Sequence, residues 1–219
     1  MIVVSSPSVI FDGHDHVLAT EAMPYPHWFM STYSLTKKLA DDRVNAAIQR
    51  GLPAVILRPK AIFGAGDTAL LPRLVEAAQH GRLPQIGDGQ NLVDLTHVDN
   101  VVHALILALN APAALGNTYT ITNNEHVRLW DVIRTVLRHY GLSTNLRRIP
   151  LAVAMLLARA MELQASITKR EPLLTRYSVA ILARTQTYDI SAAQRDLGYA
   201  PLFSVAKGIE RTLSGGNSN

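Results

Sequence analysis

Short aliphatic and β-branched runs alternate with longer segments of helical periodicity along most of this chain. Extended runs occur at residues 2–4, 54–57, 92–95 and 118–122. Amphipathic helical patterns occur at residues 31–50, 68–80, 98–110 and 129–140. Parallel strands need long crossover connections, and these are usually helices. The alternation therefore predicts an α/β fold in which a doubly wound, Rossmann-like parallel sheet carries helices on both faces.

Glycine and proline positions indicate how these elements are connected. Gly51, Gly81 and Gly141 each follow a helical pattern directly, where a residue that tolerates positive φ is favoured. Residues 2–4 are expected to form a buried strand that enters a loop. Residues 12–30 are rich in His, Asp and Pro and are expected to form an irregular surface loop.

The pattern changes after Pro150. We expect residues 1–150 to form the C-terminal part of a dinucleotide-binding domain with substrate-lobe insertions. Residues 151–213 are expected to form a smaller, mostly helical substrate lobe with one strand at 185–190, and residues 214–219 a disordered tail. The apolar run at 151–158 suits a core or lid helix, and a helix lying on a membrane surface is the open alternative.

The composition excludes several other classes of protein. With 219 residues, 48% of them hydrophobic and 17% charged, the chain is able to bury a sizeable core. The net charge of +4 comes from Lys and Arg spread along the chain, so no nucleic-acid partner is expected. The absence of cysteine excludes disulfides, thiolate metal sites and thiol nucleophiles. Residues 1–9 do not resemble a signal peptide and no run reaches the roughly 18 apolar residues of a membrane span, so a cytoplasmic location is expected.

Two segments contain side chains that are candidates for proton transfer and for hydrogen bonding to a substrate. Tyr33 and Lys37 stand four residues apart in the helix expected at 31–50, so their side chains project from one face. An ammonium near a phenol favours the phenolate, which makes Tyr33 a candidate proton donor or acceptor near neutral pH. Ser6 follows the strand expected at 2–4, and open α/β sheets bind ligands at the carboxyl ends of their strands. Its hydroxyl is a candidate hydrogen-bond partner for a substrate carbonyl.

Several further segments occur in an order that resembles one family. They read SSPSV at 5–9, YSLTK at 33–37, LRP at 57–59, FGAGD at 63–67, GDGQNLVD at 87–94 and VDN at 98–100. Together they resemble the extended short-chain dehydrogenase/reductases, the NAD-dependent epimerase/dehydratase superfamily. Residues 171–176 and 188–191 narrow the resemblance to proteins of the 3β-hydroxysteroid-dehydrogenase type, which include the 2-alkyl-3-oxoalkanoate reductases.

The resemblance implies an NAD(P)-dependent oxidoreductase that transfers a hydride between a nicotinamide cofactor and a small hydrophobic hydroxy or keto compound. Tyr33 would act as the general acid or base, Lys37 would hold the nicotinamide ribose, and Ser6 would orient the carbonyl. The cofactor contacts implied are Ser5, Tyr33, Lys37, Arg58, Pro59 and Ile62. The substrate contacts implied are Ser6, Ser8, Phe11 and Asn91. The sequence does not separate NAD from NADP, and it leaves open a homodimer formed through the helix that carries the tyrosine.

The sequence lacks the motif with which the family binds the phosphates of the dinucleotide. No G-x-G-x-x-G turn is present, and the glycines at 64–66 and 87–89 are expected to close tight turns. We therefore expect roughly the first hundred residues of the family pattern to be missing, and with them most of the dinucleotide site. A sheet without those strands would expose an apolar edge.

Two other functions remain open at this stage. Nucleotide-sugar epimerases and dehydratases usually carry an arginine where Val93 stands, so a diphosphate sugar is disfavoured. A non-catalytic remnant or binding module is consistent with the absent glycine turn. His14 and His16 lack a third ligand at suitable spacing, and no metal site is expected.

Overall fold

Three parallel strands form the sheet that positions the candidate site. In the computed structural model, residues 1–68, 70–168, 172 and 174–215 are described. Strand β3 (Val55–Pro59) lies between β1 (Ile2–Val4) and β8 (Thr118–Ile121), and both neighbours run parallel to it. All five residues of β3 are buried. The central position of β3 explains why its sequence is almost continuously aliphatic.

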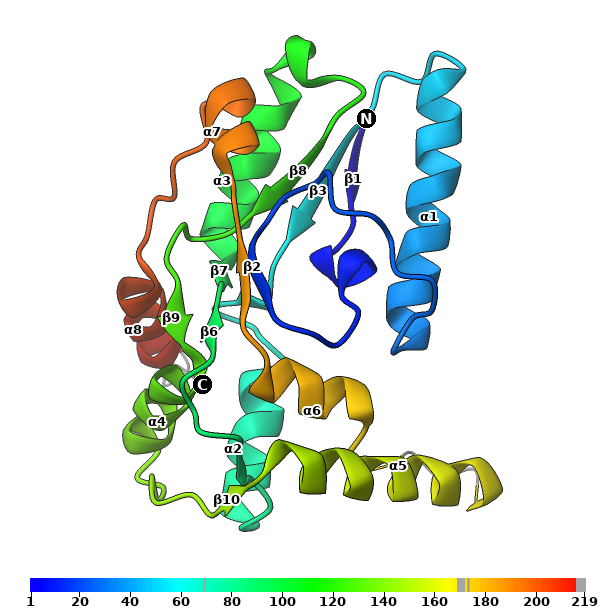
Figure 1. The fold of residues 1–219 in the computed structure, drawn as a ribbon. Coiled ribbons are helices and arrows are strands. Elements are labelled where there is room, and N and C mark those ends of the chain that lie inside the picture. Colours follow the sequence, from blue (N-terminus) through cyan, green and yellow to red (C-terminus); the bar gives the residue numbers. More distant parts are fainter. Residues whose placement is uncertain (69, 169–171, 173, 216–219) are drawn as a thin grey trace.

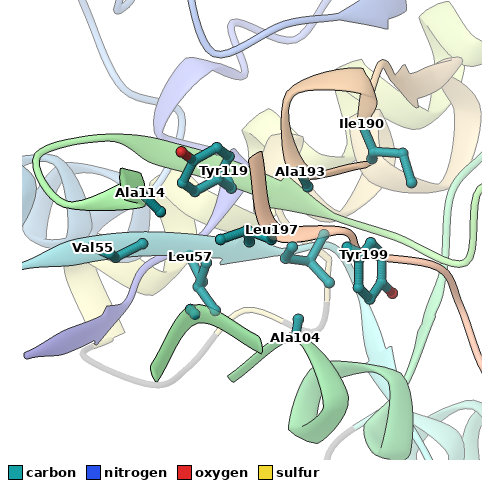
Figure 2. Packing of buried hydrophobic residues seen from close by; sticks show 11 residues of the cluster. Val55, Leu57, Ala104, Ala114, Tyr119, Ile190, Ala193, Leu197 and Tyr199 are labelled. Atoms are coloured by element: carbon teal, nitrogen blue, oxygen red, sulfur yellow. The ribbon is translucent and has the colours of Figure 1, made fainter. Parts of the chain in front are cut away.

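Helices cover both faces of this sheet, as the alternating pattern predicts. Leu57 packs with α3 (Val98–Leu109) and α7 (Ser191–Leu197) in a core cluster that Figure 2 shows around Tyr119 and Tyr199. The next residue, Arg58, points to the opposite face, where it meets α1 (Thr32–Gln49). Figure 1 shows α1 standing beside β1, on the far side of the sheet from α3. The predicted doubly wound α/β class is thus confirmed.

A second, smaller sheet brings distant segments together. Its strand order is β2 (His16–Ala19), β11 (Gln186–Tyr188), β6 (Leu92–Val93) and β9 (Val127–Arg128). Strand β11 runs parallel to both β2 and β6, whereas β9 is antiparallel to β6. The segment after residue 150 therefore supplies an inner strand between elements from the first half of the chain. The domain boundary expected at residue 150 stays a prediction.

Shorter elements complete the fold. Two parallel pairs join β4 (Ile62–Phe63) to β7 (Thr96–His97), and β5 (Gln85–Ile86) to β10 (Arg148–Ile149). The remaining helices are η1 (Pro7–Ile10), α2 (Leu71–Gln79), η2 (Pro112–Ala114), α4 (Leu129–His139), α5 (Leu151–Thr168), α6 (Arg176–Ala183) and α8 (Val205–Gly215). A second core cluster centres on the fully buried Trp130 and joins α4 to α5 and α6. Figure 1 shows α5 extending outward below the main sheet.

Two expectations about the first thirty residues need correction. Residues 2–4 form a strand, but Val4 is 42% exposed because β1 lies at the edge of its sheet and has one strand neighbour, β3. Residues 12–30 are not wholly irregular, because β2 lies within them. His16 N–H bonds the carbonyl oxygen of Thr185 at 2.8 Å, so β2 depends on a partner strand that is distant in sequence.

The bounds of other helices also differ from those expected from the sequence. Helix α2 begins at Leu71 rather than at 68, since the Asp67 carboxylate accepts hydrogen bonds from the N–H groups of Leu70 and Leu71 and Pro72 stands in the first turn. Ser214 and Gly215 belong to α8, whereas the rest of the expected tail, residues 216–219, lies outside the described residues. Contrary to expectation, α5 is long and apolar enough to cross a membrane, judged by length and composition alone.

Candidate active site

The carboxyl end of β1 positions two serines. The Ser6 side chain caps η1, and its Oγ accepts a hydrogen bond from the N–H of Ser8 at 3.2 Å. Pro7 at the first helical position fixes the backbone direction there. A hydroxyl that accepts one hydrogen bond keeps its own proton to donate. Ser6 is therefore held at the end of the strand with a donor available for a ligand.

The first turn of α1 presents Tyr33 beside the same sheet edge. Ser31 caps the helix by accepting a hydrogen bond from Ser34 N–H at 3.1 Å, so Tyr33 lies in the first turn. The Tyr33 side chain is 51% exposed, and Lys37 follows one turn later. The Nζ of Lys37 donates to the carbonyl oxygen of Val4 at 3.1 Å. Lys37 therefore reaches the end of β1, two residues before Ser6.

An unpartnered hydroxyl lies next to this arrangement. Ser5 and Ser8 are 5% and 7% exposed. Within the described part of the chain the Ser5 Oγ has no hydrogen-bond partner, whereas the Ser8 hydroxyl interacts with the side chain of Tyr177. Buried polar atoms without partners are rare in folded proteins and often belong to ligand sites. The strand end thus offers polar groups that a bound molecule is able to satisfy.

Tyr177, which was not predicted from the sequence, lies beside the serines and contacts the predicted Phe11. Tyr177 of α6 contacts Phe11 edge to face, with ring centroids 6.2 Å apart. Burial raises the pKa of Tyr177, the Ser34 hydroxyl opposes this rise, and the neighbouring Tyr33 adds to it. Tyr177 lies 144 residues from Tyr33 in sequence, so no local motif indicated it. Phe11 is 1% exposed and packs against Tyr177, so its predicted substrate contact stays a prediction.

The residues of β3 and β4 that were predicted to contact the cofactor have different environments. Arg58 is 3% exposed, and its Nη2 donates to Asp41 Oδ2 and to the Tyr25 hydroxyl, each at 2.8 Å. Pro59 is buried at the end of β3, and Ile62 in β4 is 42% exposed. The guanidinium of Arg58 is thus engaged in joining β3 to α1. A direct cofactor contact by Arg58, Pro59 or Ile62 stays a prediction.

Asn91, His14 and His16 each contact another residue of the chain. Asn91 is buried and donates from Nδ2 to the carbonyl oxygen of Arg184 at 3.3 Å, so its predicted substrate contact stays a prediction. His16 Nε2 lies 3.0 Å from Asp12 Oδ1. Over the described ranges, no group of three or more His, Cys, Asp or Glu side chains is arranged to hold a metal ion.

The sequence of residues 1–153 matches the profile of the 3-beta hydroxysteroid dehydrogenase/isomerase family. The chain belongs to this family. It is 37% identical to an Arabidopsis thaliana 3beta-hydroxysteroid-dehydrogenase/decarboxylase, isoform 1, over 97% of this chain and 52% of that protein. It is 34% identical to the 2-alkyl-3-oxoalkanoate reductase of Stenotrophomonas maltophilia, over 96% of this chain and 66% of that protein. The chain thus spans between about half and two thirds of these relatives' lengths.

Solved structures support the fold assignment. The dTDP-glucose 4,6-dehydratase of Bacillus anthracis, crystallised in complex with NAD, superimposes with a TM-score of 0.71 at 20% sequence identity. The similarity covers 100% of this chain and 61% of that one. At this identity the similarity shows the fold alone. Together with the family match, it confirms the predicted resemblance to extended short-chain dehydrogenase/reductases.

Proposed function

We propose that this chain provides the catalytic part of an NAD(P)-dependent oxidoreductase that acts on a hydrophobic hydroxy or keto compound. The observation that carries the proposal is the hydrogen bond from Lys37 to Val4, because it brings the helix with Tyr33 against the strand end that holds Ser6. Family membership and the predicted roles of these three side chains support the same chemistry.

In the proposed reaction, each of these side chains has one task. Tyr33 gives a proton to the substrate oxygen during reduction and takes it back during oxidation. Ser6 donates a hydrogen bond from its hydroxyl to the same oxygen and keeps its proton, which holds the carbonyl in position. Lys37 would hold the ribose of the nicotinamide, the role that the family resemblance implies for it. The contact between Phe11 and Tyr177 places aromatic rings beside these side chains, which supports a hydrophobic substrate.

The residues present fit the nicotinamide end of a dinucleotide. When bound, such a cofactor donates or accepts the hydride. The buried hydroxyl of Ser5 lacks a partner in the part of the chain that the structure describes, and Lys37 bonds the preceding residue, Val4, at the end of β1. Ser5, Lys37, Pro59 and Ile62 would therefore hold the nicotinamide and its ribose. Both NAD and NADP are compatible with these residues.

A nucleotide-sugar substrate is less compatible with the structure. Val93, which stands where epimerases and dehydratases usually carry an arginine, is 4% exposed in β6 and lines an apolar cavity. A diphosphate would have no guanidinium to bind at this position. We therefore favour an apolar substrate over a diphosphate sugar.

The proposal is tested by NADH- or NADPH-dependent turnover of a set of hydrophobic ketones. The assay is run on this chain and on the chain fused behind a glycine-rich dinucleotide-binding segment from a relative. Ketone-dependent oxidation of the reduced cofactor by the fusion supports the proposal. A folded fusion that binds NADH but turns over no ketone indicates a binding module instead, and tight UDP-sugar binding indicates an epimerase or dehydratase.

We also propose that α5 contacts a membrane surface. Leu156, Leu163 and Ile167 are 69%, 60% and 83% exposed, while Ala154 and Ala158 pack against the protein body. Glu162 bonds Arg176 at 2.7 Å, which ties α5 to the start of α6 and favours a helix that lies flat over one that spans. Sedimentation with liposomes tests this, and binding that is unchanged in Leu163→Glu would exclude α5 as the contact. A cytoplasmic location stays a prediction.

A homodimer through α1 is the remaining proposal about partners. Leu35 and Leu39 are 40% and 52% exposed on this helix, and their burial by a second copy would remove apolar surface from water. Sedimentation equilibrium of the wild type and of Leu39→Asp tests the proposal. A wild type that is monomeric at micromolar concentration would rule it out.

A further inference from the structure

The proposed reaction gives no task to the hydroxyl of Tyr177, which lies in the first turn of α6. The Tyr177 ring packs edge to face against Phe11, with the ring centroids 6.2 Å apart. Phe11 is the C-cap of η1, and its N–H bonds the carbonyl oxygen of Ser8. Phe11 also contacts His16 of β2, whose ring centroid is 5.8 Å away. Tyr177 therefore packs against the short helix that begins directly after Ser6.

The phenol of Tyr177 interacts with the hydroxyl groups of Ser8 in η1 and Ser34 in α1. Both serines are buried, with exposed fractions of 7% and 1%. Within the described residues, Ser8 Oγ has no other hydrogen-bond partner. A phenol has one proton to donate and an oxygen that accepts, so it is able to donate to one serine and accept from the other. The Tyr177 hydroxyl thus bridges η1 and α1.

Each of the two serines is next to a residue of the proposed catalytic set. The N–H of Ser8 donates to Ser6 Oγ at 3.2 Å. Ser34 follows Tyr33 in the first turn of α1, and its Oγ lies 2.9 Å from that of Ser31, the N-cap of the helix. A displacement of either bridged serine would therefore move the catalytic side chain beside it.

The start of α6 is held by contacts that do not involve η1 or α1. Thr175 and Ser178 form a capping box at its N-terminus. The backbone N–H and the Nε of Arg176 bond the Glu162 carboxylate of α5 at 2.8 and 2.7 Å. Figure 1 shows α6 on the side of the main sheet at which β1 ends and α1 begins. Tyr177 therefore belongs to an anchored element and joins two others.

We propose that Tyr177 is a positioning residue for the site of hydride transfer. Its hydroxyl joins η1 to α1 and thereby sets the distance between the side chains of Ser6 and Tyr33. The inference rests on the proposed function, because it concerns the two side chains that act on the substrate oxygen there. Tyr177 acts through its serine neighbours and needs no contact with the substrate. A misplacement of about 1 Å is enough to lower turnover roughly a hundredfold.

The bridge itself is tested by a double-mutant cycle on stability. Tyr177→Phe removes the hydroxyl and keeps the ring that packs against Phe11, and Ser34→Ala removes one of the two bridged hydroxyls. Urea denaturation gives the unfolding equilibrium constants of the wild type, the single variants and the double variant. Because the bond is lost only once, the double variant should be destabilised less than the combined single effects, by about threefold or more. Independent effects of the two changes overturn the bridge.

The positioning role is tested by steady-state kinetics of the fusion protein. Tyr177→Phe should lower kcat for a hydrophobic ketone by about tenfold or more and leave KM within about twofold of the wild type. A merely structural role would reduce the folded fraction and leave kcat per folded molecule unchanged. Adding Ser34→Ala to Tyr177→Phe should cause little further loss of turnover. Tyr119→Phe, which removes a tyrosine hydroxyl that bonds Asp196 of α7, is the matched control and should retain wild-type turnover.

Each outcome decides the inference. Turnover by a folded Tyr177→Phe within about threefold of the wild type, or an equal loss in Tyr119→Phe, overturns the positioning role. A wild-type fusion that binds NADH but turns over no ketone refutes the proposed function, and the positioning role with it. The stability cycle needs no turnover, so it decides in either case whether the bridge exists.

Discussion

The Nζ of Lys37 and the carbonyl oxygen of Val4 lie 3.1 Å apart and form a hydrogen bond between α1 and the carboxyl end of β1. Val4 is the last residue of its strand, and Ser6 follows two residues later. This bond joins the helix that carries Tyr33 to the strand end that precedes Ser6, and the buried ion pair between Asp41 and Arg58 joins the same helix to β3.

Replacing Lys37 with methionine should lower turnover by about tenfold or more in the fusion protein used to test the proposed function. The change removes both the bond to Val4 and the positive charge beside Tyr33. Lys38→Met is the matched control, because Lys38 is the next residue of the same helix and bonds Asp42 instead of Val4. Steady-state kinetics of both variants check this, and equal losses in the two would show that Lys37 has no special role.

The buried ion pair between Asp41 and Arg58 should make a large contribution to folding. Both side chains are almost fully buried, so Asp41→Asn leaves a guanidinium without its counter-charge. We expect the free energy of unfolding to fall by roughly 3 kcal/mol, measured by urea denaturation. Asp42→Asn, at the adjacent half-buried position, should change it by less than about 1 kcal/mol. Similar small effects of both changes would argue against a structural role for the pair.

Lys60 should make stability increase with pH in the alkaline range. Its pKa is about 8 in the folded protein, below its ordinary value of 10.5. Below pH 8 the ammonium is charged in both the folded and the unfolded state, and its burial destabilises the fold. Between these two values the folded protein releases the proton first, so the destabilisation disappears as the pH rises.

The measurement is the difference in unfolding free energy between the wild type and Lys60→Met at pH 7 and pH 10. We expect the wild type to gain roughly 2 kcal/mol relative to the variant over this interval. Subtracting the variant removes the contribution of other titrating groups. A difference that stays constant, or that moves the other way, would mean that the lysine is not desolvated in solution.

The sequence predicted the elements whose signals are local. Helix α1 was expected over residues 31–50 and spans Thr32–Gln49, because Ser31 caps its start and Gly51 follows its end. The position of Ser6 after a parallel strand was likewise predictable, since a short β-branched run followed by two serines and a proline marks a strand end.

Features that depend on distant partners were not predictable. Strand β2 exists because it pairs with β11, and its own sequence, His-Val-Leu-Ala, contains no turn-bounded alternation. The bond between Lys60 and Gln186 joins residues 126 positions apart, and Tyr177 reaches the candidate site from α6. Arg58 was expected at the cofactor, but no sequence pattern pairs it with Asp41 on α1.

The most direct test of the proposed catalytic site is the turnover number of Tyr33→Phe in the fusion protein. The change removes only the phenolic hydroxyl, so we expect at least about a hundredfold loss of turnover with an unchanged melting temperature and unchanged NADH binding. Tyr140→Phe, which alters another half-exposed tyrosine, should retain wild-type activity. Turnover by a folded Tyr33→Phe within about threefold of the wild type would contradict the assignment of Tyr33 as the general acid or base.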